Sequence, residues 1–216
     1  MCFSATASFA GGVIISSIGV VAIRKNREPS QRLFAAIPMV FGIQQISEGF
    51  VWFALQSPGH DIVLKVSAYF FLTLALVFWP TMLPLSVLLM ENSEKRRRAL
   101  HVFLAAGILV SLCYGMAMLI FKVTAQISSH HILYAIAFPQ QLAAAASFSY
   151  LIVTLPPLFV SSIRRMYLLG IVMVLSYSVT CIFFKEYLIS VWCLFAALAS
   201  VIILWVVLNR KTVANG

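Results

Sequence analysis

Long apolar runs, separated by short polar or charged connections, dominate this sequence. Seven of them have the length of about 20 residues that a helix needs to cross the hydrocarbon core of a bilayer. They cover residues 4–23, 33–55, 62–90, 99–121, 140–160, 166–184 and 187–208. The runs are continuously apolar, whereas strands of a membrane β-barrel alternate between polar and apolar residues. The pattern therefore predicts an all-α fold, a polytopic membrane helical bundle of seven transmembrane helices, formed by a single domain over residues 1–216.

Two stretches are expected to depart from straight helices. The run at 62–90 is too long for one straight span and contains Pro80 and Pro84, which predicts a kink or a tilt. The connection at 123–139 is longer than the others and is rich in apolar residues. Connections of that length are uncommon and often functional. We predict that this one folds back as a short interfacial or re-entrant helix.

Small residues mark two runs for close helix packing. In the first run Ser8, Gly12 and Ser16 recur every four residues, which places them on one face of a helix. Near the start of the fifth run, residues 143–147 are four alanines and a serine. Transmembrane helices associate through small residues that let their backbones approach closely. Both stretches therefore predict helix–helix contacts.

The composition supports a membrane protein. Of the 216 residues, 62% are hydrophobic and 10% are charged, whereas a soluble domain has about 45–50% and about 25% respectively. This difference excludes an ordinary soluble enzyme.

The net charge of +9 is distributed unevenly between the connections. Twelve of the 15 Lys and Arg residues follow the first, third, fifth and seventh runs. Cytoplasmic loops carry the excess of positive charge, so the N-terminus is predicted to lie outside and the C-terminus in the cytoplasm. These basic residues flank helix ends, where anionic lipid headgroups account for them. The predicted partner is therefore the lipid bilayer and not nucleic acid.

Glu48 is the acidic residue that lies well inside an apolar run. On a helix, Gln44, Glu48 and Gln45 fall within about 100° of one another, and Trp52 continues the same stripe. An ionisable group inside a membrane is costly, which makes Glu48 a catalytic or ligand-binding candidate and its three neighbours pocket-lining candidates. Two plainer interpretations stay open. The carboxyl could be hydrogen-bonded and only join helices, and Trp52 could be an interfacial anchor, as could Trp79.

A metal site is a further hypothesis. The predicted topology puts Cys2, Glu48, His130 and His131 toward the outer side. Sulfur, oxygen and nitrogen ligands of this kind suit zinc or another transition metal. His131 is also a catalytic candidate beside Glu48, with a metal-activated water as the reacting group. The spacing adds little support, because the chain has no HExxH or CxxC motif and adjacent histidines are equally at home in an exposed loop.

The opening MCFSATASFAGG, the segment IPMVFGIQQISEGFVW and the HHILY stretch resemble an uncharacterised family of bacterial multi-pass membrane proteins. The resemblance covers the whole chain and implies a protein of the bacterial inner (cytoplasmic) membrane, with no established activity to carry over. It also implies that Cys2 has a role beyond membrane insertion. The seven-helix zinc hydrolases of the alkaline ceramidase and progestin-receptor-like group offer only an analogy of fold. Those proteins place an HxxxH pair in the last helix, and the last run here has no histidine.

Three functions are compatible with this pattern. The first is a membrane-embedded, hydrolase-like enzyme that acts on a lipid or small amphiphile at a polar site in the outer half of the bundle. The second is a carrier, channel or sensor for a proton, cation or small solute, with Glu48 on its path. The third is a structural or accessory subunit. Because the polar groups gather in the outer half, the first is favoured, while the substrate, the metal, the oligomeric state and the pairing of the four cysteines stay open.

Overall fold

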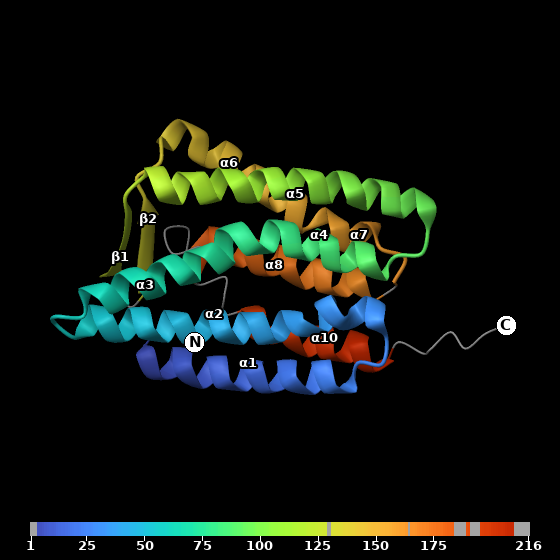
Figure 1. Cartoon of the computed structure of the whole chain (residues 1–216), viewed down its shortest axis with the longest axis horizontal. Helices are drawn as coiled ribbons and strands as arrows, with labels where there is room; N and C mark the ends of the chain where they lie inside the picture. The colour runs from blue at the N-terminus through green and yellow to red at the C-terminus, as the bar shows by residue number, and fades with distance from the viewer. Residues whose placement is uncertain (1–3, 129–130, 164, 184–188, 191–194, 210–216) are drawn as a thin grey trace.

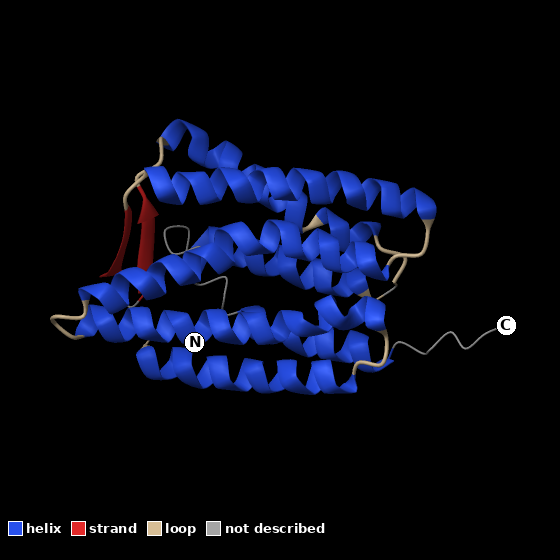
Figure 2. Cartoon of the chain, in the orientation of Figure 1, coloured by secondary structure: helices blue, strands red, loops and turns tan. Residues whose placement is uncertain are grey.

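The computed structural model describes residues 4–128, 131–163, 165–183, 189–190 and 195–209. Almost all of this part of the chain is helical (Figure 2), and most of the helices run roughly along the long axis of one bundle (Figure 1). The helices are α1 (Ala5–Lys25), α2 (Arg32–Gln56), α3 (Asp61–Leu72), α4 (Trp79–Met90), α5 (Glu94–Ile120), α6 (Gln140–Thr154), α7 (Pro156–Val160), α8 (Met166–Phe183) and α10 (Ala196–Asn209). A short 3₁₀ turn, η1 (Pro29–Gln31), leads into α2, and a π-helical segment, η2 (Thr73–Phe78), joins α3 to α4.

Within the described residues, six helical segments are long and apolar enough to cross a membrane. They are Ala5–Lys25, Pro29–Gln56, Asp61–Met90, Glu94–Ile120, Gln141–Val160 and Met166–Phe183. These segments match the first six predicted runs and confirm the prediction of a helical membrane bundle. Of the seventh run, the structure describes the 14-residue helix α10. Most of the rest of that run lies outside the described residues.

The outer surface of the bundle is apolar. Large side chains such as Leu119 on α5 and Ile62 on α3 are 86% and 80% exposed, respectively. A water-soluble protein rarely exposes large contiguous apolar surfaces, whereas a bilayer solvates them. The surface therefore agrees with the composition and with helices that contact lipid.

The connections lie at two opposite ends of the bundle. Figure 1 shows the connections after α1, α4 and α7 at one end, and the turn between α2 and α3 at the other. Basic residues lie next to the first group, among them Arg24 and Lys25 at the end of α1 and Arg97 in the first turn of α5. We call this end the basic end and the opposite one the hairpin end, after the strands described next. The alternation of basic and less basic connections along the sequence thus places most basic residues at one end of the bundle.

The connection at 123–139 is a β-hairpin. Strand β1 (Val123–Ser128) pairs antiparallel with β2 (His131–Ile136), and Val123 lies opposite Ile136. The prediction of an interfacial or re-entrant helix is therefore wrong. The physical reason is a period of two in β2, where Tyr134 is buried and its neighbour Ala135 is exposed. The Tyr134 ring stacks on Phe71 of α3 with their centroids 4.8 Å apart, which fixes the hairpin on the bundle.

The long run that contains Pro80 and Pro84 is one continuous helix with a π-helical segment immediately before Trp79. Proline has no backbone N–H, so Pro80 cannot donate to the carbonyl of Leu76 four residues earlier. The sequence predicts a kink or tilt here, and the structure shows that the irregularity takes the form of six residues with π-helical geometry.

Side chains from other helices bond to carbonyl groups of this π segment. The Tyr150 hydroxyl donates to the carbonyl of Ala75 over 2.8 Å. The Ser111 hydroxyl donates to the carbonyl of Val77 over 2.6 Å. Irregular backbone inside a membrane needs such partners, because lipid offers none. These two bonds also join the segment to α6 and α5.

The small residues of α1 lie directly against α2. A Cβ atom on Gly12 would lie 2.9 Å from the carbonyl oxygen of Gly42, and a Cβ on Gly42 would lie 2.6 Å from the backbone nitrogen of Ser16. Any side chain at either glycine would separate the two backbones. The prediction of close packing at this stretch is therefore confirmed.

A buried carboxylate joins two connections at the basic end. Glu91 follows α4 and is almost fully buried. One of its oxygens accepts from the backbone N–H groups of Asn92 and Ser93, over 3.0 and 2.9 Å. The other accepts from the N–H of Ser162, between α7 and α8, over 2.6 Å. Burial opposes the charge of Glu91, but the hydrogen bonds outweigh it and lower the pKa of the carboxyl below its ordinary value.

Replacing Glu91 with glutamine is expected to lower the free energy of unfolding by about 1–3 kcal/mol at pH 7, because one backbone donor loses its charged acceptor. A carboxyl whose folded pKa is depressed stabilises the protein above its unfolded pKa, and this contribution is lost as the pH falls through the folded pKa. The gap between wild type and Glu91→Gln should thus narrow below about pH 4. Denaturant unfolding in detergent at pH 7 and at acidic pH measures this difference in free energy of unfolding. Glu94→Gln, at an exposed position, is the control. A gap that does not change with pH would contradict this account.

Candidate functional site

A cavity of about 520 Å³ lies inside the bundle, between α4, α5, α6 and α8 and beside the hairpin. Its lining residues are Phe41, Gln44, Ala75, Leu76, Trp79, Leu83, Leu109, Val110, Cys113, Tyr114, Ala117, Tyr134, Ile136, Phe138, Ala143, Ala146, Ser147, Ser149, Tyr150, Leu151, Thr154, Leu155, Leu158, Met173, Tyr177 and Ile189. Most of these side chains are aliphatic or aromatic, and none is formally charged at pH 7. The chemistry of the wall therefore suits an apolar ligand with few polar groups.

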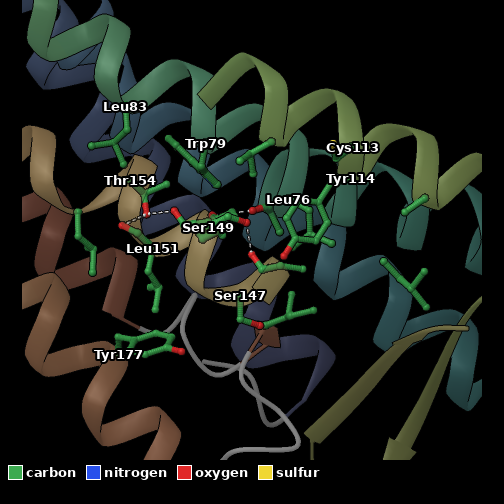
Figure 3. Close-up of a pocket in the computed structure, with 18 of the residues that line it drawn as sticks. Leu76, Trp79, Leu83, Cys113, Tyr114, Ser147, Ser149, Leu151, Thr154 and Tyr177 are labelled. Atoms are coloured by element: carbon green, nitrogen blue, oxygen red, sulfur yellow. Dashed lines mark hydrogen bonds between the residues drawn. The ribbon is translucent and has the colours of Figure 1, made fainter. Parts of the chain in front are cut away.

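The polar groups of the cavity come from several helices. Figure 3 shows Tyr114 of α5 and Tyr177 of α8 reaching in from opposite sides, with Ser147 of α6 between them. The hydroxyls of Ser149 and Thr154 are engaged by α6 itself, because they donate to the carbonyls of Ala146 and Tyr150, each over 2.8 Å. Nothing in the sequence indicates that Tyr150 and Tyr177 meet at one cavity.

The deep wall of the cavity is fixed by a bond between α2 and α4. Trp79 donates from its indole nitrogen to the side-chain oxygen of Gln44 over 2.9 Å. The two residues are 4% and 2% exposed, and the Phe41 ring packs on Trp79 with centroids 4.2 Å apart. Trp79 is therefore a buried wall residue, and its assignment as an interfacial anchor is wrong. The same interpretation is wrong for Trp52, which is 2% exposed.

Glu48 lies next to this wall and is fully buried. One carboxyl oxygen accepts from the side-chain nitrogen of Gln45 over 2.7 Å. The other accepts from the hydroxyl of Ser190 over 2.5 Å. The chain neighbours of these partners, Gln44 and Ile189, line the cavity, whereas Glu48 itself does not belong to the lining. The carboxyl thus joins α2 to the segment at 189–190 from behind the cavity wall.

Of the three pocket-lining candidates from the sequence, only one lies at the cavity. Gln44 lines the cavity, and neither Gln45 nor Trp52 is a lining residue. Ser190, which sequence reasoning missed, is the partner of Glu48 from the far end of the chain. Ser190 is one of two serines in the apolar run at 187–208, which was the available signal, but nothing in the sequence relates it to a residue 142 positions away.

The metal hypothesis receives no support from the described residues. They contain no group of three or more His, Cys, Asp or Glu side chains that could hold an ion. Cys2 and His130 lie outside the described part. His131 is buried at the start of β2, opposite Ser128.

Two cysteines are described, and both are free thiols. Cys113 is exposed and lines the cavity from α5, while Cys181 on α8 is partly buried. The other two cysteines lie outside the described residues. The exposed thiol at Cys113 is a native point for chemical modification beside the cavity.

These features define a class, a multi-pass helical membrane protein with an apolar cavity beside a buried carboxyl. The chain belongs to the family described as "Family of unknown function (DUF6629)", whose family model matches residues 1–215. This match agrees with the resemblance to an uncharacterised family. No curated protein and no solved structure matches the chain.

Proposed function

We propose that the chain crosses a bacterial inner membrane seven times, with its N-terminus outside and its C-terminus in the cytoplasm. Support comes from the six spanning segments, the apolar helix α10 and the arrangement of the connections at two ends (Figure 1). The basic end then faces the cytoplasm and the hairpin end faces outward, as the positive-inside rule requires.

In that setting, the function best supported by the geometry is the binding of a lipid or small amphiphile in the central cavity. The observation that carries this proposal is an apolar space of about 520 Å³, within the range of about 300–1,000 Å³ that is typical of ligand pockets. A compact bundle with no ligand would gain dispersion energy by filling such a space with side chains. Hydroxyl groups such as those of Tyr114 and Ser147 can orient the polar part of the ligand.

The enzyme hypothesis goes one step beyond binding, to hydrolysis with Glu48 and His131 as catalytic groups and a zinc-like metal as cofactor. In the structure both oxygens of Glu48 already accept hydrogen bonds, behind the cavity wall. We therefore propose that the protein binds this ligand, without hydrolysing it. The full burial of Glu48 favours a second candidate, a carrier or sensor in which this carboxyl takes up a proton or cation as the cavity fills.

A pair of neighbouring alanines on α6 tests the binding proposal. Ala146 lines the cavity, and Ala145 is exposed and does not. A fatty acid with a diazirine on its chain, added to protein in nanodiscs and photolysed, is expected to cross-link to α8 near Met173 and Tyr177. Ala146→Trp should reduce this product by at least about tenfold because the indole occupies the space, while Ala145→Trp should leave it unchanged.

The cross-linked positions are mapped by peptide mass spectrometry. Products confined to the outer surface of the bundle, with equal yields in both variants, would overturn the proposal. A loss of product in Ala145→Trp as well would show that the reaction does not report on the cavity.

A further inference from the structure

The lining of the cavity falls into two groups by exposure. On the deep side, Gln44, Trp79 and Leu158 are almost fully buried. On the facing sides of α5 and α6, by contrast, Leu109 is 63% exposed and Ser147 is also exposed. A cavity whose lining is exposed on one side opens on that side. The opening therefore lies between α5 and α6.

The residues of α6 explain why this side stays open. Ala143 and Ser147 line the cavity and are exposed, although their small side chains predict close helix packing. That prediction is wrong for α6, because the first turns of this helix do not bury these side chains against α5. On α5 the exposed Cys113 lies on the same side. We call Leu109, Cys113, Ala143 and Ser147 the portal residues.

The portal lies in the half of the bundle toward the hairpin end. Ala143 and Ser147 belong to the first two turns of α6, which begins directly after the hairpin. Cys113 is seven residues from the end of α5 at Ile120, or about 10 Å along the helix. Ile136 of β2 also lines the cavity at this end. With the proposed topology, the portal faces the outer leaflet of the membrane.

In a bilayer, lipid tails and not water would surround this opening. The face of α5 beside it exposes Leu112, Met116 and Leu119, which are side chains that a bilayer solvates. The portal residues carry no charge, so an alkyl chain can pass them without loss of hydration, whereas a charged group would pay a desolvation cost. At the membrane surface, the exposed Lys122 directly follows α5 and suits a lipid phosphate.

We propose that the cavity is loaded from the bilayer, by a phospholipid of the leaflet on the hairpin side that inserts one acyl chain through the portal between α5 and α6. The tail enters first and reaches the wall at Trp79 and Leu83, while the headgroup stays at the surface near Lys122. This inference rests on the proposed function and adds the class of ligand and its route.

Tryptophan substitutions at the portal test the route, each with a neighbour as its control. Ser147→Trp and Cys113→Trp narrow the portal, whereas Ala144→Trp and Leu112→Trp change exposed residues that do not line it. The probe is a phosphatidylglycerol with a diazirine on one acyl chain, incorporated in liposomes with the protein. Wild type and both controls are expected to give cross-links at Met173 and Tyr177, and the two portal variants are expected to give about tenfold less.

Alkylation of the native Cys113 thiol repeats the test without a substitution that could impair folding. Once peptide mass spectrometry shows that N-cyclohexylmaleimide has alkylated Cys113 in folded wild type, the phospholipid cross-link should fall, and the same treatment of Cys113→Ser should leave it unchanged. An undiminished cross-link in the portal variants and after alkylation would overturn the lateral route.

A diazirine fatty acid separates failure of the route from failure of binding. If it labels the cavity of wild type and the phospholipid does not, the lateral proposal falls and the binding proposal stands. If neither probe labels the cavity, the binding proposal fails as well.

Discussion

Replacing Gly107 with alanine is expected to lower the free energy of unfolding by about 1–3 kcal/mol. Gly107 lies on α5 against the carbonyl group of Pro80, and an added Cβ would lie 3.0 Å from the Pro80 carbonyl carbon and closer still to its oxygen. A backbone carbonyl cannot rotate away as a flexible side chain can. This carbonyl also lacks the usual donor of a helix, because Pro84, four residues later, has no N–H to bond to it.

Gly115 provides a matched control on the same helix. A Cβ there would meet only a methyl group of Val77 at 3.9 Å, which is ordinary contact. Alanine has the higher helix propensity, by about 1 kcal/mol in water, so Gly115→Ala should be neutral or stabilising. Unfolding in mixed detergent micelles compares the variants. Equal effects at the two positions would show that contact with Pro80 does not limit the approach of α5 to α4.

The helices could be predicted from the sequence because their cause is local. In lipid, each backbone polar group must find its partner within the same segment, so a run of about 20 apolar residues already specifies a helix. The stripe of Ser8, Gly12 and Ser16 likewise follows from spacing within one helix. Its counterpart on α2 at Gly42 does not, because nothing in the first run indicates which helix it meets.

The hairpin could not be derived in the same way. A strand makes no hydrogen bonds within itself, and the pairing of Val123 with Ile136 depends on a second segment and on its register. Strand β2 (HILYAI) is short and mostly apolar, and such runs are ambiguous between helix and strand. Strand β1 (VTAQIS) alternates apolar and polar residues, which is the pattern of a strand, but it covers only six residues. The alternation of buried Tyr134 and exposed Ala135 becomes clear only when the bundle provides one face to bury.

In the site, too, the features within one helix could be predicted and the contacts between helices could not. The sequence places the Glu48 carboxyl between two glutamines on one stripe, but the structure assigns them different partners. Gln45 bonds to Glu48, and Gln44 bonds to Trp79, which is 35 residues away. The alanines of α6 were equally ambiguous, since small side chains permit either close contact or an opening, and the position of α5 decides between them.

The buried carboxyl at Glu48 is expected to give the largest effect of any substitution in the site. Glu48→Leu leaves both the Gln45 amide and the Ser190 hydroxyl without their acceptor in the membrane interior. Each unsatisfied buried donor costs about 1–3 kcal/mol, so the free energy of unfolding should fall by about 2–6 kcal/mol. Glu48→Gln keeps one acceptor oxygen and should cost about 1–3 kcal/mol.

A double-mutant cycle with Ser190→Ala measures the interaction between Glu48 and Ser190. The coupling energy is the difference between the stability change of the double variant and the sum of the changes in the two single variants. Unfolding in mixed micelles supplies these values, with exposed Glu94→Gln as the control. A cost for Glu48→Leu as small as that of the control would contradict the bonding described here.

Fatty-acid cross-linking of Glu48→Gln then separates two roles for the carboxyl. If labelling of the cavity is retained despite the lower stability, Glu48 only joins α2 to Ser190. If labelling is lost in a variant that still folds, the carboxyl also governs occupancy of the cavity, as the carrier or sensor candidate requires.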